Sequence, residues 1–290
     1  MVQEKKQEKT QDKTEDKTKA VRLWGVSALE KILVSTKELL NRNVLDFAVR
    51  WIFRIGHIGL LSAAALGFLF SLVVAIRLDS FSAFLYGIAW VVLVLVVQYV
   101  AHRFAATGDS LIENNPSSLS SKAFLDCLGL LAVIGGLIAL VLGTVRSIQG
   151  AGIRFILVGA ALFILLELFA IVAFNPDTIS TATGGKNSAG QEAIGIIVLF
   201  IKGFMRLVPI LFGIGIAAGF VLLAIDAFGI FGSEYRLLAD WKRAMYTGRI
   251  IVFSGLVPFL SYIGFVIAYL AVDVVRAILA TPEKIEALRK

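Results

Sequence analysis

Four ionisable residues in or beside long apolar stretches are the side chains of this chain best suited to chemistry. Glu167 is the acid placed deepest in such a stretch, while His57, Lys202 and Arg206 lie near the ends of others. A carboxylate removed from water must be protonated, paired or hydrated, so one hypothesis is that these residues line a pathway for protons or a small cation. The competing hypothesis, which we favour, is that Glu167 is neutral and hydrogen-bonds to a neighbouring helix.

Enzyme signatures do not emerge from the sequence. The two histidines, His57 and His102, are too few for a histidine-rich metal centre, and neither stands in an H-E-x-x-H helix. The G-x-S-x-G motif of serine hydrolases does not occur. The run at 184–187 resembles a P-loop only superficially, since Ser180 replaces its first glycine and Asn187 the hydroxyl residue that would hold magnesium. We therefore expect no catalytic residue, metal or cofactor, and predict a protein that is not an enzyme.

The elements that must position these side chains are six long apolar segments between Ile55 and Val275. Hydrophobic residues make up 58% of the chain and the mean hydropathy is +0.85, far above a soluble domain. A bilayer core about 30 Å thick requires about 20 apolar residues of helix, because a helix satisfies its own backbone hydrogen bonds. The expected fold class is all-α: a polytopic helical membrane protein with six transmembrane helices paired as three antiparallel hairpins. The expected spans are 55–76, 81–101, 123–145, 153–174, 207–231 and 250–275.

The fifth span is the hardest to delimit, because the apolar stretch 193–231 is nearly twice as long as one crossing. Lys202 and Arg206 occupy its first half, and a cation at mid-bilayer costs about 2.5 to 3.5 kcal/mol. We therefore predict that the span begins at Leu207 and that the residues before it lie near the membrane surface. Pro209 is compatible with a simple kink, the more frequent outcome, or with a broken helix, and together with the glycines after it makes this span the best candidate for a moving element. The basic segment 232–249 is expected to be a loop with a short helix at the headgroup level.

Small residues recur at packing intervals in three spans, and each set forms a smooth stripe on one helix face. Such stripes let helices approach closely in lipid. Contact within the chain is the simpler interpretation, and a face for a homo-oligomer or a membrane-protein partner is the alternative. The stripes are Gly59, Ala63 and Gly67, then Gly129, Gly136 and Gly143, and finally Gly215 and Gly219.

The N-terminal part of the chain differs in composition from the six-helix domain, 55–275. Residues 1–22 are charged and repetitive and predict a disordered tail, whereas 23–54 carry apolar residues at helical spacing between basic ones. The latter pattern predicts an amphipathic interfacial helix on the membrane surface, with Arg42, Arg50 and Arg54 facing lipid. Packing of this helix on a partner protein or on the chain's own loops is the alternative. A short cytoplasmic tail is expected at 276–290.

The net charge of +7 is spread over termini and loops, so it predicts contact with anionic lipid and not with nucleic acid. Thirteen basic residues flank the spans on the side of the N-terminus and seven on the other side, which places both termini in the cytoplasm. The basic segment 232–249 disagrees with this orientation. A plasma (inner) membrane location is expected.

Two functions are compatible with these patterns. Abundant packing glycine and scarce intramembrane polarity favour a non-enzymatic structural, assembly or partner-binding role in the bilayer. The alternative is a small channel or secondary transporter for protons or a small ion, in which Glu167 and a broken fifth helix line the pathway.

Overall fold

The computed structural model describes residues 30–151, 154–184, 188–228 and 234–288, and the expected tail at 1–22 lies outside this range. The chain divides into two compact units, 1–41 and 42–290, which are described separately. In the first unit, residues 30–39 form a helix on which Ile32, Val34 and Leu39 are exposed. The second unit contains the six long helices.

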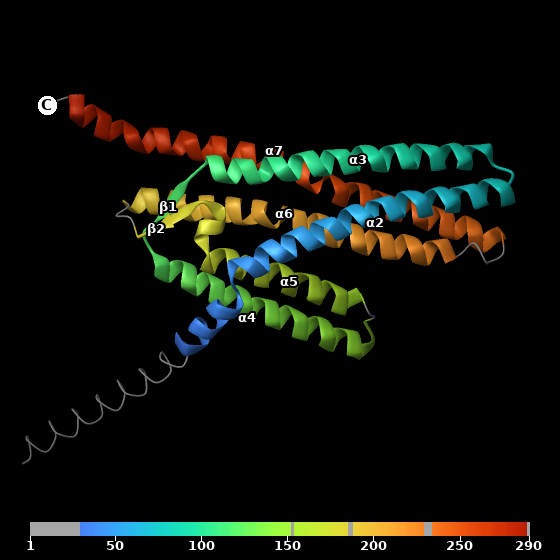
Figure 1. Ribbon diagram of the computed structural model, residues 1–290, viewed down its shortest axis with the longest axis horizontal. Helices are drawn as coiled ribbons and strands as arrows, with labels where there is room; N and C mark the ends of the chain where they lie inside the picture. Colours follow the sequence, from blue (N-terminus) through green and yellow to red (C-terminus); the bar gives the residue numbers. More distant parts are fainter. Residues whose placement is uncertain (1–29, 152–153, 185–187, 229–233, 289–290) are drawn as a thin grey trace, which may run out of the picture. The chain divides into compact units, whose positions relative to one another are not determined.

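The expected fold class is confirmed. Six helices are long and apolar enough to cross a membrane, and they pack in adjacent pairs as three hairpins (Figure 1). The helices are α2 (Arg42–Arg77), α3 (Phe81–Asn114), α4 (Lys122–Arg146), α5 (Arg154–Phe174), α6 (Ala189–Ala227) and α7 (Glu234–Leu288).

The α2–α3 and α6–α7 hairpins form one core, and Figure 1 shows α2 and α6 side by side. Close approach requires glycine at their crossing, because a Cβ on Gly56 would lie 2.5 Å from the ring of Phe212. One turn further along both helices, Gly59 meets Ile216 in the same way, so α2 and α6 run in the same direction. This parallel pair brings the first turns of α2 next to the first half of α6.

The α4–α5 hairpin packs mainly on itself. The Ser121 hydroxyl accepts the Phe124 N–H at 3.2 Å and caps the start of α4. The reversal uses a short π-helical segment, η1 (Ser147–Ala151), in which Gly150 has a φ of 89° that only glycine adopts freely. The hairpin contacts α6 through Phe169, whose ring stacks on Phe200 at 5.8 Å.

Two short strands join the connections that flank this hairpin. β1 (Ser117–Leu119) and β2 (Thr181–Thr183) pair in parallel, with Ser117 opposite Thr181. A 3₁₀ turn, η2 (Pro176–Ile179), leads into β2. The Ser/Thr-rich sequence around β2 favours a flexible loop, and its order comes from a strand partner more than sixty residues away, which local sequence does not reveal.

The helices that contain the last two expected spans begin earlier than those spans. α6 begins at Ala189 and continues without interruption through Pro209, so the fifth helix is not broken. α7 begins at Glu234, within the segment expected to be a loop. Its early residues pack on the core, since the Trp241 ring contacts Phe70 edge-on at 5.6 Å.

The first and last boundaries also differ from expectation. The helix expected at 23–54 is interrupted at residues 40–41. Its second part, from Arg42, is the start of α2, which continues directly into the first span. α7 extends to Leu288 and includes most of the range expected to be a short tail.

Candidate functional site

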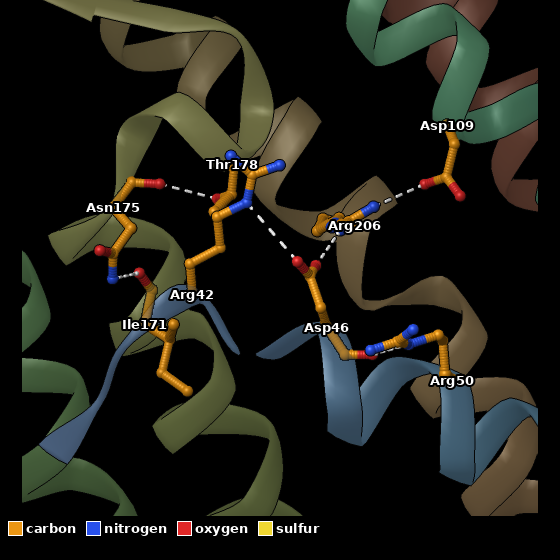
Figure 2. Close-up of polar contacts among 8 residues, drawn as sticks. All are labelled: Arg42, Asp46, Arg50, Asp109, Ile171, Asn175, Thr178 and Arg206. Atoms are coloured by element: carbon orange, nitrogen blue, oxygen red, sulfur yellow. Dashed lines mark hydrogen bonds and ion pairs between the residues drawn. The ribbon is translucent and has the colours of Figure 1, made fainter. Parts of the chain in front are cut away.

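The strongest polar contacts of the second unit gather where α2, α3 and α6 meet. Arg206 of α6 donates from Nη2 to Asp46 of α2 at 2.6 Å and from Nη1 to Asp109 of α3 at 2.9 Å (Figure 2). Arg42 Nε lies 3.5 Å from the second carboxylate oxygen of Asp46, and Arg50 Nε donates to the Asp46 carbonyl at 3.0 Å. One arginine therefore ties three helices together.

Lys202, one turn before Arg206, is completely buried. Its Nζ donates to Ser117 Oγ at 3.0 Å, to the Ile179 carbonyl at 3.0 Å and to the Ser180 carbonyl at 3.2 Å. An ammonium group has three protons to donate, so these acceptors use all of them. Lys202 thus fastens β1 and the end of η2 to α6.

The surroundings of Lys202 explain why this cation lies inside α6, although the fifth span was expected to begin only after it, at Leu207. Isolated lysine at mid-bilayer costs about 2.5 to 3.5 kcal/mol, but hydrogen bonds from the β1–β2 region replace the lost water. Ser180 adopts a left-handed conformation with φ of 50°, and its carbonyl also accepts the Ser117 N–H at 3.1 Å. Polar loop backbone, buried under protein, therefore solvates the charge.

Glu192 reinforces the same region from the start of α6. Its carboxylate accepts the Ser120 N–H at 2.8 Å and the Ser121 N–H at 3.1 Å, and the Ser120 hydroxyl also donates to it. These bonds satisfy backbone groups at the start of α4. Together with Lys202 and Arg206 they form what we term the α6 clamp: Asp46, Asp109, Ser117, Glu192, Lys202 and Arg206.

His57 lies deeper between the helices. Its ring contacts Phe53 at 4.5 Å, Phe212 at 5.2 Å and His102 at 5.9 Å between centroids. Nε2 of His57 is buried and has no hydrogen-bond partner among the described residues. The aromatic contacts indicate a packed position for this imidazole.

Glu167 stands apart from the other residues of the hypothetical pathway. It belongs to α5 and faces α4, where a Cβ on Gly136 would lie 3.3 Å from its Oε1. No described residue forms an ion pair or hydrogen bond with it, and the structure shows no contact that joins it to His57, Lys202 or Arg206. The nearby Phe169 and Val172 of α5 both approach α6, at Gly203.

The residues of the small-residue stripes lie at contacts within the chain. Gly129 faces Phe174 and Gly143 faces the backbone of Phe155, so that stripe packs inside the α4–α5 hairpin. In the core, Gly67 meets Trp90, whose Nε1 donates to the Ala63 carbonyl at 2.9 Å. Gly215 and Gly219 face Ser254 and Ile251 of α7.

The basic residues at the start of α2 differ in their surroundings. Phe47, Arg50, Trp51 and Arg54 line a shallow notch of about 240 Å³. The Arg54 guanidinium lies 5.6 Å from the centre of the Trp51 ring, in cation–π geometry. Arg42 instead turns toward Asp46.

Sequence reasoning missed the acceptors of the clamp. Asp46 is spaced four residues from both Arg42 and Arg50 on one helix, a pattern that signals ion pairing on that helix but not its bond to Arg206. Asp109 and Ser117 reach the clamp only through the tertiary fold, and no local signal marks them.

Chemically, the clamp is a set of hydrogen bonds and ion pairs in which Lys202 Nζ and both terminal nitrogens of Arg206 donate to protein acceptors, whereas the buried Arg206 Nε has no partner among the described residues. The described residues contain no group of three or more histidine, cysteine or acidic side chains that could hold a metal ion. The six candidate spans among the described residues define an integral membrane protein. Comparison with protein-family models, with curated proteins and with solved structures finds no match to the chain.

Proposed function

We propose that this integral membrane protein has a non-enzymatic assembly or partner-binding role and that it engages anionic lipid with the first turns of α2. The observation that carries the proposal is the α6 clamp. Both cations that would otherwise suggest a pathway, Lys202 and Arg206, are bound to protein acceptors that hold helices and strands together. A rigid bundle with its polar groups used internally suits a scaffold.

The lipid-binding part of the proposal rests on the notch at the start of α2. Arg50 and Arg54 stand beside Phe47 and Trp51, which are 58% and 49% exposed. Exposed aromatic rings next to cations are typical of the membrane interface, where rings enter the headgroup region and cations meet phosphate. With this end at the inner leaflet, both termini are cytoplasmic and the host is a plasma (inner) membrane.

The alternative proposal, a channel or transporter for protons or a small ion, ranks second. It requires Glu167 and a broken fifth helix to act together, yet α6 is continuous through Pro209. Glu167 faces Gly136 of α4.

The test compares binding of spin-labelled phosphatidylglycerol and phosphatidylcholine to the reconstituted protein by electron paramagnetic resonance. Replacing Arg50 and Arg54 with glutamate should lower the preference for phosphatidylglycerol several-fold. The matched control, Lys122→Glu with Arg146→Glu, makes the same change in net charge away from the notch and should keep the preference. Equal loss in both double variants would show that net charge, and not the notch, selects the lipid.

A further inference from the structure

An apolar cavity of about 500 Å³ lies far from the notch, between α3 and α7. Its floor includes Gly67 and Phe70 of α2 and Leu223 of α6, and Trp90 and Trp241 form part of its walls. Almost every lining side chain is apolar or aromatic. A space of this size holds a substantial part of a small hydrophobic ligand.

The cavity is elongated along the helices. Its lining on α7 extends from Trp241 to Leu256, which is about 22 Å at 1.5 Å per residue. On α3 the lining extends only from Tyr86 to Leu93, about 10 Å, so the cavity holds part of one acyl chain. Exposed lining residues such as Tyr86 and Phe253, 57% and 65% exposed, open it toward the surface of the bundle. A long apolar slot on a lipid-facing surface fits an acyl chain.

Arg249 is the one charged side chain among the described residues that line the cavity. It is exposed, and no described residue forms an ion pair or hydrogen bond with it. Two residues earlier, the Thr247 hydroxyl donates to Asp226 Oδ2 at 2.9 Å, and two residues later Ile251 faces Gly219, so Arg249 lies about one turn before the end of α6 and midway along the lining of α7. A cation beside an apolar slot complements an anionic headgroup, because a guanidinium binds phosphate through paired hydrogen bonds.

We propose that this cavity is a binding site for one anionic phospholipid, with an acyl chain along α3 and α7 and its phosphate paired with Arg249. The site is separate from the notch at the start of α2 and goes beyond the proposed function. It explains two features together: an apolar slot that opens to the surface of the bundle, and a cation beside it for which the described protein provides no anion.

Tryptophan fluorescence tests the site directly, because two of the four tryptophans, Trp90 and Trp241, line the cavity. Replacing Trp24 and Trp51 with phenylalanine leaves a reporter protein that detects quenching by bromine on an acyl chain. In bilayers, brominated phosphatidylglycerol should quench at about a tenfold lower mole fraction than brominated phosphatidylcholine, the preference that one charge-assisted hydrogen bond supplies. Equal quenching by the two lipids would overturn the proposal.

Two pairs of variants in the reporter protein separate the headgroup contact from the slot. Arg249→Gln should abolish the preference for phosphatidylglycerol, whereas Lys242→Gln, which removes an exposed cation outside the cavity, should keep it. Ala89→Phe fills the slot from α3 and should weaken quenching by phosphatidylglycerol, whereas Val96→Phe, on the lipid-facing side of the same helix outside the cavity, should not.

The same experiment distinguishes this site from the notch. Replacing Arg50 and Arg54 with glutamate in the reporter protein should leave the preference for quenching by phosphatidylglycerol unchanged, since neither residue lines the cavity. Each variant is first checked for a single monodisperse peak in detergent. A preference that survives in folded Arg249→Gln would refute the assignment of the phosphate to Arg249.

Discussion

Arg206 shows how much of this fold depends on single side chains. Its two carboxylate partners are 97 and 160 residues away in the sequence, and they belong to different helices. The apolar helices have little specificity of their own in lipid, where close packing and polar contacts decide which helices associate. A bridging arginine with two fixed acceptors therefore selects one arrangement of α2, α3 and α6.

A double-mutant cycle between Asp46 and Arg206 should give a coupling free energy of about 1 to 2 kcal/mol. This coupling free energy is smaller than the roughly 3 to 5 kcal/mol of stability that is lost when a fully buried ion pair is broken. The reason is that Asp46 remains 31% exposed, so water partly screens its charge. Thermal unfolding of Asp46→Asn, Arg206→Gln and the double variant in detergent measures it. Asp177→Asn, at an exposed position, serves as the control, and additive effects would show that the ion pair contributes nothing.

Lys202→Met should destabilise the protein by about 1 to 3 kcal/mol, because it removes the ammonium hydrogen bonds to Ser117 Oγ and to the Ile179 and Ser180 carbonyls while it keeps the aliphatic stem. The region 176–183 should also be cut faster by protease, since it loses its attachment to α6. Exposed Lys122→Met provides the comparison. Identical unfolding temperatures and proteolysis rates in the two variants would mean that Lys202 does not hold β1 and η2 against α6.

Residue types inside the apolar stretches could be recognised from sequence, but their partners could not. The sequence marked Lys202 and Arg206 as unusual, and both are central to the clamp. The expected topology linked them to Glu167, because it places all three toward the same leaflet, yet the structure places Glu167 against α4. The pairing of charged residues depends on how each helix is rotated about its own axis. A nearly uniform apolar helix has only weak hydrophobic periodicity, so its sequence does not reveal this rotation.

At the scale of elements, length and apolar composition predicted the helices well where no charge interrupts them. The observed α4 and α5, Lys122–Arg146 and Arg154–Phe174, match the expected spans within one residue at each end. The differences fall on α6 and α7, whose spans were expected to begin after cations treated as if they faced lipid, whereas the helices begin before these cations. A cation satisfied by protein, such as Lys202, imposes no boundary, and that compensation comes from distant loop residues.

The α4–α5 hairpin depends on backbone approach at Gly143. A Cβ there would lie 2.6 Å from the Phe155 carbonyl oxygen, so Gly143→Ala must push the helices apart. We expect a loss of about 1 to 3 kcal/mol, typical of overpacking. Gly264→Ala is the matched control, because nothing lies within 4 Å of its Cβ position. Thermal unfolding in detergent measures both, and equal stability would contradict the close contact.

At the scale of the whole molecule, three hairpins place every second helix in the same direction. The α2–α3 turn and the start of α6 should therefore face opposite sides of the membrane. With Cys127 replaced by alanine, a cysteine at Ser80 should react with an impermeant thiol reagent on intact cells, whereas one at Ser188 should be protected until the cells are opened. The reverse result would invert the orientation, and labelling at both sites would disprove an odd number of crossings between them.

The transport alternative also belongs to this scale, because it requires a continuous path through the bundle. Glu167→Gln should leave proton flux in liposomes at the level of empty vesicles, as in the unaltered protein. Flux in the unaltered protein that disappears in this variant would establish the alternative function. Asp177→Asn, which changes an exposed acid outside the helices, controls for charge removal.

The pairing of β1 with β2 has a consequence for how such a chain could have arisen. Because Ser117 lies opposite Thr181, the sequence departs from the bundle and returns to it at nearly the same point. Segments whose two ends adjoin are the ones that proteins gain or lose as whole insertions. The α4–α5 hairpin therefore meets the geometric requirement for an inserted unit, because its removal would leave two chain ends that already adjoin at β1 and β2.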